Sequence, residues 1–515
     1  MPRMQAPESG VTVRMYRQGH GDCFLLATRK ADGSAFYMLI DCGLWTNSEI
    51  KPEQTIDKVI ADIAEATGNR LDVVLVTHEH MDHVNGFAAK DPATRKPCFD
   101  PIGIGELWLA WTEDGNDPFA NSLRERFHDT LLALMGADER LDRAGFGIHS
   151  PNRTMLRDLL SFETGEDAAD ALRERFREVK RRHPALSPRR QGALAIEGIT
   201  NKRAIKYLRD RIAGEPVFLR PDHDPYRLPG VEGVRVYALG PPRDVELLLS
   251  LEPQGEEEFR LSADGATLSL LAATVDAGPE SASRSFDPRF GISRKDVERS
   301  HDAFLKAFFT DHYGVKGKRS AAEAWRQIDN DWLESAETLA LRLNDEVNNT
   351  SLVIAIELPG TRKVLLFTGD AQRGNWISWA PLKWTVDGQT ITARDLLGRT
   401  VLYKVGHHGS HNATLDGGVG ANYANLSWLA SNAFQDEFVA MIPANTPWAA
   451  HKEKPWEHPL RFIEERLMQK ARGRVFRSDV DHVAKPDDIS ADEWQKFKRI
   501  ETELFFEYTV ADSPA

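Results

Sequence analysis

A run of metal-binding side chains directly after a buried strand constrains this chain more than any other feature. Residues 71–76 (LDVVLV) have the length and composition of a buried strand, and the sequence continues Thr-His-Glu-His-Met-Asp-His. His78 and His80 are two residues apart, so they project to the same side if the extended conformation continues. The chain must then turn, which brings Asp82 and His83 to a second position nearby. Two imidazoles beside a carboxylate–imidazole pair suit two adjacent divalent ions, zinc or manganese.

Two later strands end in further candidate ligands. Residues 363–370 (KVLLFTGD) end in Asp370, whose carboxylate can bridge two ions. Residues 401–410 (VLYKVGHHGS) bring His407 and His408 to the end of another strand. Each of these residues alone is a weak signal, because a single strand-end aspartate is more often a cap. The three motifs in this order are together highly specific.

Strand and helix patterns near both ends of the chain predict an α/β core. A short turn between residues 23–29 and 35–43 indicates a hairpin. The full set of predicted core elements is a helix at 52–66 and strands at 11–18, 23–29, 35–43, 71–76, 105–111, 234–240, 351–358, 363–370, 401–410 and 437–445.

The middle of the chain differs from both ends. Residues 113–340 are rich in Arg, Asp and Glu, and we predict an insertion there, with a core strand near 234–240 and a linker at 276–291. The flanking segments, 1–112 and 341–515, would be the two halves of one domain. We favour inserted helices with charged, solvated faces. The alternative is a phosphate-binding surface formed by Lys180, Arg181, Arg182, Arg189 and Arg190.

Composition narrows the class of protein. The 515-residue chain has a formal net charge of -13, which disfavours a general polyanion-binding surface but leaves room for a local basic groove. Its 3 cysteines are too few and too scattered for a disulfide framework or a cysteine zinc site. We find no signal-peptide pattern and no window of the roughly 18 apolar residues that a membrane span needs. These features predict a soluble cytoplasmic protein without membrane contacts.

The motifs resemble those of the metallo-β-lactamase fold superfamily, and within it the hydrolase domain of ComEC-type competence proteins, which act in DNA uptake. The resemblance covers roughly 11–110 and 340–510 and implies a four-layer αββα sandwich with large, partly helical insertions. The matching segments, in the order of the family, are GHGDCFLL (19–26), LIDCG (39–43), THEHMDHVNG (77–86), NNTSLVIAI (348–356), LLFTGDA (365–371), LYKVGHHGSH (402–411) and HPL (458–460).

The resemblance also implies a role for each side chain of the site. Asp41 would be a buried carboxylate that fixes the turn beside the metals without binding an ion. The implied ligands are His78 and His80 for one ion, Asp82, His83 and His407 for the other, and Asp370 as the bridge.

One ligand of the family is absent. Where metallo-β-lactamase enzymes usually have another histidine, this chain reads Asn-Asp-Glu-Val-Asn-Asn at 344–349, and ComEC-type proteins also tend to have Asn there. Asn348 or Asn349 would ligate weakly through its amide oxygen or contact substrate, which would leave the first ion loosely held and tolerant of manganese. Less favoured sources of the missing ligand are His128, His149, His223, His301 and His312.

The predicted chemistry is hydrolysis. Two ions held ~3.5–4 Å apart lower the pKa of a bridging water, so that a hydroxide forms at neutral pH. Asp82 would orient that hydroxide, and His408 would either protonate the leaving oxygen or only pack beside the ligands. The candidate substrate contacts are Asn349, Ser410 and His458.

The substrate class remains a choice between hypotheses. A phosphodiesterase or nuclease is favoured by the DNA-uptake resemblance and by the arginine-rich insertion, so the expected partner is a phosphodiester, with nucleic acid among the candidates. A small-molecule hydrolase acting on a lactone, thioester or phosphoester is the alternative, which the negative net charge favours. A non-catalytic metal-binding scaffold is disfavoured because nearly every ligand position is filled. Trp376, Trp379 and Trp384 are predicted as core residues, with base stacking as the alternative.

Overall fold

The computed structural model describes residues 3–45, 47–51, 54–143, 151–164, 168–186, 188–196, 200–258, 297, 299, 302–313, 331–450 and 456–513. Within these ranges no helix has both the length and the apolar character needed to cross a bilayer. The linker predicted at 276–291 lies outside the described residues.

The first sheet is built mainly from the N-terminal part of the chain. Within the described residues it has eight strands, in the order β15-β16-β1-β2-β3-β4-β5-β6. The hairpin of β2 and β3 is antiparallel, as predicted, whereas β3, β4, β5 and β6 run parallel. The strands are β1 (Gly10–Tyr16), β2 (Cys23–Arg29), β3 (Ala35–Cys42), β4 (Arg70–Val76), β5 (Gly103–Ala110), β6 (Val217–Leu219), β15 (Arg499–Glu501) and β16 (Phe505–Ala511).

The second sheet comes mainly from the C-terminal part. Its order among the described residues is β14-β13-β12-β9-β8-β7, with β7 and β8 antiparallel and β9, β12, β13 and β14 parallel. A separate hairpin joins β10 (Lys383–Val386) to β11 (Gln389–Thr392). The strands of the sheet are β7 (Arg235–Gly240), β8 (Val353–Glu357), β9 (Val364–Phe367), β12 (Thr400–Lys404), β13 (Val439–Ile442) and β14 (Val475–Arg477).

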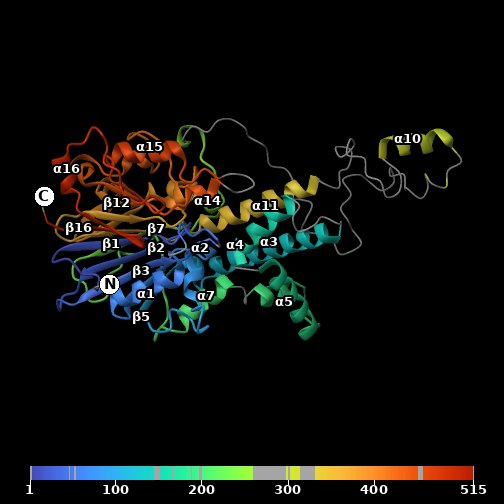
Figure 1. Ribbon diagram of the computed structural model, residues 1–515, viewed down its shortest axis with the longest axis horizontal. Helices are drawn as coiled ribbons and strands as arrows, with labels where there is room; N and C mark the ends of the chain where they lie inside the picture. The colour runs from blue at the N-terminus through green and yellow to red at the C-terminus, as the bar shows by residue number, and fades with distance from the viewer. Residues whose placement is uncertain are drawn as a thin grey trace.

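The two sheets pack face to face, because alternate strand residues are apolar on both sides. Phe24 of β2 and Ile354 of β8 lie in one buried cluster between the sheets. Their neighbours Leu25 and Val353 point the other way, into separate clusters under the outer helices. Figure 1 shows α1 (Ile56–Thr67) below the sheets and α15 (Arg461–Lys470) above them. The predicted α/β class, a four-layer sandwich with helical insertions, is therefore confirmed.

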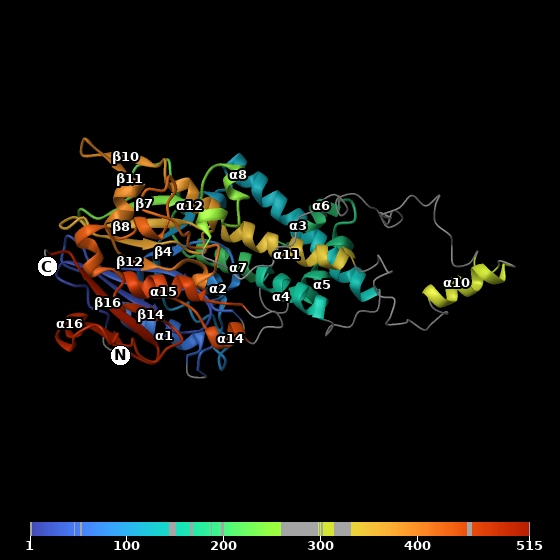
Figure 2. The ribbon, with the colours of Figure 1, turned by 90° about the horizontal axis from the view of Figure 1, so that it is seen from above.

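Helices of the central segment extend from one end of the sandwich, opposite the end where both termini lie (Figures 1 and 2). Several of these helices share a buried apolar cluster that includes Leu134, Leu160, Ala195 and Leu343. The helices of this extension are α3 (Pro118–Arg143), α4 (Pro151–Thr164), α5 (Ala168–Arg182), α6 (Pro188–Ile196), α7 (Thr200–Arg209) and α11 (Asp331–Asn348).

The remaining helices are short or lie at the edges of the sandwich. They are α2 (Met81–Val84), α8 (Val245–Leu248), α10 (Ala303–Tyr313), α12 (Arg373–Trp379), α13 (Ala393–Gly398), α14 (Thr446–Ala450) and α16 (Ala491–Lys496). Trp376, Trp379 and Trp384 are at most 5% exposed and pack under the second sheet, which confirms the core interpretation of these residues.

Candidate metal centre

β4 delivers the first two histidines of the site. The strand is buried between β3 and β5, and the chain leaves it at Thr77 in an extended conformation before α2 begins at Met81. His78 Nε2 and His80 Nδ1 lie 3.0 Å apart, and both side chains are buried. The other nitrogen of His78, Nδ1, contacts the hydroxyls of Thr77 and Ser351 at 3.1 and 3.2 Å. One nitrogen of each imidazole is therefore directed at a common point.

Beside this pair lies a second cluster, formed by Asp82, His83, Asp370 and His408. All four residues are buried, and their candidate ligand atoms lie within 4.8 Å of one another. Asp370 Oδ2 is 3.2 Å from His83 Nε2 and 3.9 Å from His408 Nε2, and His408 Nε2 is 2.9 Å from Asp82 Oδ2. Residues from β4, β9 and β12 meet here because these strands end at the same edge of the sandwich.

The chemistry of these atoms fits divalent ions. Asp82 Oδ1, His83 Nε2 and Asp370 Oδ2 are buried and lack a hydrogen-bond partner among the described residues. Buried polar atoms in native proteins nearly always have hydrogen-bond partners. The contacts among these three atoms are ion pairs only, at 3.2 Å from His83 Nε2 to Asp370 Oδ2 and 3.7 Å to Asp82 Oδ1, so the cluster fits a group that binds all of them. Imidazole nitrogens with carboxylate oxygens are a donor set for zinc or manganese.

Opposite charges stabilise one another within the cluster, and an ion that binds at Nε2 of His83 would displace the second proton of this imidazole. Burial alone would lower the pKa of His83, but the carboxylates of Asp370 and Asp82 outweigh burial and raise that pKa well above its usual value. Burial would raise the pKa of Asp370, yet the positive charges of His83 and Lys404 keep it well below its usual value. The carboxylate of Asp370 is therefore ionised at neutral pH, as a metal ligand must be.

Asp41 fixes the orientation of His83. Its Oδ1 accepts the backbone N–H of Thr77 at 2.8 Å, and its Oδ2 accepts from the Thr77 hydroxyl at 2.7 Å. The same Oδ2 is 2.8 Å from His83 Nδ1, so the N–H lies on Nδ1 and Nε2 faces the cluster. This contact is the geometry expected for a carboxylate that orients a ligand without being one.

Two glycines allow the metal loop to approach the neighbouring backbone. A Cβ on Gly43 would lie 2.4 Å from the carbonyl carbon of Asp82, and a Cβ on Gly21 would lie 2.6 Å from the Asp82 oxygen. Asp22 donates its backbone N–H to that oxygen at 3.0 Å, and its carboxylate pairs with Lys404. The segment GHGDC therefore packs directly under Asp82.

The turn after β12 places its two histidines differently from the sequence-based expectation. His407 and His408 have φ values of 43° and 54°, in the left-handed region that side chains rarely adopt. From the sequence we expect His407 to hold the second ion and His408 either to protonate the leaving oxygen or only to pack beside the ligands. In the structure His408 joins the cluster with Asp82, whereas His407 Nε2 is 3.3 Å from the amide nitrogen of Asn348. The left-handed turn rotates the two side chains apart, so that His408 faces Asp82 and His407 faces Asn348.

The two asparagines before β8 have different environments. Asn349 is held by the fold, because its Nδ2 donates to the carbonyls of Leu247 and Leu248 and its Oδ1 accepts from the backbone of Gln372 and Asn375. Asn349 therefore has no free polar atom with which to make the substrate contact that was expected of it. Asn348 is fully buried, and its Oδ1 has no partner among the described residues.

The remaining candidate contacts lie around the same turn. Ser410 is buried, and its hydroxyl donates to Asn412 Oδ1 at 3.1 Å. His458 is partly exposed, and its Nδ1 is 3.3 Å from His20 Nε2. His20 was not singled out from the sequence, although its position in the segment GHGD was the available signal. Its ring lies 3.9 Å from that of His408, centroid to centroid.

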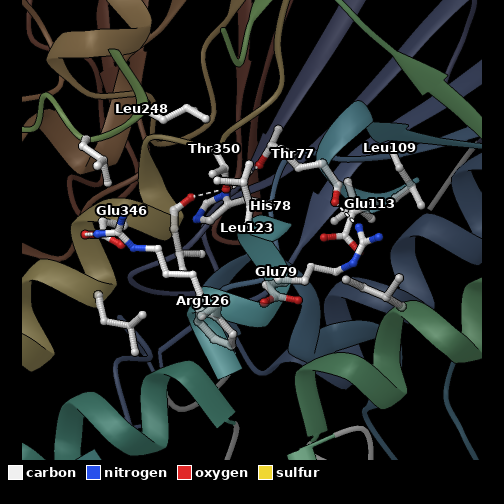
Figure 3. A pocket seen from close by; sticks show the side chains of 18 residues that line it. Thr77, His78, Glu79, Leu109, Glu113, Leu123, Arg126, Leu248, Glu346 and Thr350 are labelled. Atoms are coloured by element: carbon white, nitrogen blue, oxygen red, sulfur yellow. Dashed lines mark hydrogen bonds and ion pairs between the residues drawn. The ribbon is translucent and has the colours of Figure 1, made fainter. Parts of the chain in front are cut away.

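The central helices also reach the metal loop. Glu79 forms a largely buried ion pair with Lys202 of α7, and Glu163 of α4 lies 3.1 Å from His80 Nε2. A cavity of about 80 Å³ lies beside the loop, and Figure 3 shows His78 and Glu79 on its wall together with Arg126. Its other walls are mostly apolar side chains of the central segment and β5. The sequence did not predict these contacts.

The less favoured histidines do not join a metal-binding group in the described part of the chain. His223 Nδ1 is 2.7 Å from the carbonyl of Asp224, and burial lowers the pKa of His128 to about 4. His149, His301 and the side chain of His312 lie outside the described residues.

The carboxyl group of Asp345, near the site, has a raised pKa. Burial, reinforced by the negative charge of Glu252, raises its pKa to about 7, although Gln372 donates a hydrogen bond to it at 2.7 Å. The folded protein therefore binds a proton here that the unfolded chain releases near its usual 3.8, so this group lowers the free energy of unfolding as pH rises from about 4 to 7. We expect Asp345→Asn to remove this contribution.

The measurement is urea unfolding of metal-free protein across this pH range. The difference in unfolding free energy between Asp345→Asn and wild type should grow with pH, with a slope of at most about 1.4 kcal/mol per unit. If the unfolding free energies of the two proteins instead differ by a constant amount at every pH, Asp345 has the same pKa in the folded and unfolded chain, and the prediction is wrong.

Comparison with curated proteins finds no match to this chain. A family model does match, and the matched segment contains Asp41, His78, His80, Asp82 and His83. Residues 16–99 are similar to the metallo-beta-lactamase superfamily, whose family model matches this part of the chain.

Proposed function

We propose that this protein is a metal-dependent phosphodiesterase of the nuclease type with two divalent ions. One observation carries the proposal: buried, unpaired ligand atoms of Asp82, His83 and Asp370 meet beside the convergent nitrogens of His78 and His80. The superfamily match supports metal-dependent hydrolysis as the general chemistry.

The donor atoms divide into two sets. His78 Nε2 and His80 Nδ1 would hold the first ion, with the unpaired Asn348 Oδ1 as the candidate for its missing ligand. The second ion would be held by Asp82, His83 and His408, and Asp370, which lies in the same group, would bridge the two ions. When bound, two such ions supply Lewis acidity, lower the pKa of water and clamp the oxygens of the group under attack.

Neighbouring side chains fix the ligands before substrate arrives. Asp41 holds the N–H of His83 on Nδ1, and the N–H of His78 lies toward the Ser351 hydroxyl. His408 Nδ1 is 2.6 Å from the carbonyl of Pro443, so the N–H lies on Nδ1 and Nε2 faces Asp82 Oδ2 at 2.9 Å. Each imidazole therefore presents one defined nitrogen to the site, which is the preorganisation that catalysis requires.

His407 is the side chain that we assign to the substrate. Burial lowers its pKa to about 4, so it is neutral at pH 7. Its Nε2 accepts from Asn348, which leaves the N–H on Nδ1, and Nδ1 has no partner among the described residues. A neutral donor of this kind suits a phosphoryl oxygen that gains charge in the transition state. The partly exposed His458 lies nearby, with ring centroids 5.6 Å apart.

Three features favour a phosphodiester. The ComEC-type motifs suggest a nucleic-acid substrate by resemblance, and two cations match the charge of a phosphoryl transition state. Lys180, Arg181 and Arg182 are exposed at the end of α5 and Arg190 is exposed on α6, where they can contact a polyanion. The side chain of Arg189 lies outside the described residues.

A small-molecule hydrolase is the second candidate. The cavity beside His78 favours it, because apolar side chains such as Leu109, Phe127 and Leu343 form about half of its wall. A pocket of this kind suits the apolar part of a lactone or thioester better than a sugar–phosphate backbone.

The deciding experiment is a hydrolysis assay of metal-loaded protein. Linear and circular DNA, RNA and cyclic dinucleotides are compared with lactone and thioester substrates, and Asp82→Asn serves as the inactive control. We expect cleavage of at least one phosphodiester, with polymer binding that weakens as salt rises. Turnover of a lactone or thioester with every phosphodiester intact would overturn the proposal in favour of the second candidate.

A further inference from the structure

A carboxylate of the central helices lies against a histidine of the metal loop. Glu163, near the C-terminal end of α4, is 2% exposed, and its Oε1 is 3.1 Å from His80 Nε2. Its Oε2 has no hydrogen-bond partner among the described residues. The contact joins positions 83 residues apart in the sequence, across the boundary between the sandwich and its helical extension.

The end of α4 is held in place from several sides. Asn201 of α7 donates to the carbonyls of Phe162 and Glu163 at 3.0 and 3.1 Å. The ring of Phe162 stacks on Trp45 with centroids 4.0 Å apart, and it also contacts the ring of His80 at 4.5 Å. The Glu163 carboxylate is therefore fixed relative to the metal loop.

The contact defines which nitrogen of His80 can bind an ion. Because Nε2 faces a carboxylate, it carries the hydrogen and donates to Glu163. Nδ1 is then the unprotonated nitrogen, and it is the atom that lies 3.0 Å from His78 Nε2. A carboxylate that accepts from the far side of a ligating imidazole fixes its tautomer and ring orientation and makes the ligand more basic.

We propose that Glu163 is a positioning residue that orients His80 toward the first ion. The inference rests on the proposed metal site but not on the phosphodiester substrate. The first ion lacks the third histidine that the family usually provides, so its affinity depends more strongly on the orientation of the two that remain. The helical extension is then part of the metal site rather than an appendage to it.

A second contact from the same extension supports this role. Lys202 of α7 pairs with Glu79, which lies in the sequence between His78 and His80. The side chains of this pair are 17% and 11% exposed, so water screens the interaction only in part. The central helices thus hold the metal loop at Glu79 and at His80.

The test is a titration of Co²⁺ into metal-free protein, followed by visible absorption and by calorimetry. Glu163→Ala should weaken binding of the first ion by roughly 10–100-fold, the usual cost of losing such a partner. Glu163→Gln keeps the shape and one acceptor oxygen, so its affinity should lie between those of Glu163→Ala and wild type. The second ion should bind all three proteins alike, and the absorption bands should keep their positions because the ligands are unchanged.

A matched control separates positioning from packing. Asp138 is a buried carboxylate of the same helical extension that pairs with Arg153 at 2.7 Å, so Asp138→Asn perturbs the extension without removing the contact to His80. Asp138→Asn should bind both ions as wild type does. Three results would each overturn the inference. The first is an equal loss of affinity for the first ion in Asp138→Asn and Glu163→Gln, and the second is wild-type affinity in both Glu163 variants. The third is a shift of the visible absorption bands in Glu163→Gln.

The two proposals fail in distinguishable ways. If the wild-type protein binds no ion, the metal site itself is refuted. If it binds two ions and the Glu163 variants bind them equally well, only the role of Glu163 is refuted. Neither result depends on which substrate the enzyme cleaves.

Discussion

Asp370→Asn should remove most of the bound metal and lower hydrolysis by at least about 10³-fold. Asp370 Oδ2 lies 3.2 Å from His83 Nε2 and 3.9 Å from His408 Nε2, within the second set of proposed ligands. If Asp370 bridges two ions, the substitution would remove the negative charge that both of them share. Several kcal/mol of transition-state stabilisation depend on those cations, and each 1.4 kcal/mol corresponds to a factor of about ten.

The measurement combines elemental analysis with turnover of the best substrate. Asp395→Asn is the matched control, because Asp395 caps α13 through Thr392 and belongs to no metal-binding group among the described residues. The control should lose some stability but keep its metal and activity. Full metal content in Asp370→Asn would contradict the bridging role.

Substitutions of the two histidines after β12 should have the second large effect, one on metal binding and the other on turnover. His408→Ala should weaken the second ion by more than the roughly 10–100-fold typical of an outer partner, because a direct ligand is lost. His407→Ala should keep both ions and lower turnover by ~10²–10³-fold, as expected when one donor to the developing charge is removed. The neighbouring side chains are thus a ligand and a substrate contact.

Metal content and turnover of the two variants, measured side by side, check this assignment. Each variant serves as the control for the other, because both truncate an imidazole in the same left-handed turn. A metal-free His407→Ala with a fully loaded His408→Ala would restore the assignment that the sequence suggested.

The sequence predicts the fold well because the strands are strongly apolar. Alternate residues of β2 and β8 lie on opposite faces of their sheets. Phe24 and Ile354 face the space between the two sheets, whereas Leu25 and Val353 face the outer helices, so the pattern predicts two packed sheets. β6 was not predicted, because its three residues, Val217–Leu219, are too few to show a period. That strand forms only by pairing with β5.

The candidate site could be predicted only in part. His83 and Asp370 follow strands whose ends meet at one edge of the sandwich, so spacing brings them together. The orientations of His407 and His408 depend on positive φ angles, which residue type does not reveal. Glu163 is one of many acidic residues on charged helices, and only tertiary packing shows that it lies against His80.

The metal content of the purified, reconstituted protein tests the central claim most directly. The account predicts close to two zinc, manganese or iron ions per chain, and about one in the double variant His78→Ala with His80→Ala, because the second set of ligands remains. A wild-type protein that binds no such ion after reconstitution, or a double variant that keeps both ions, would contradict the account.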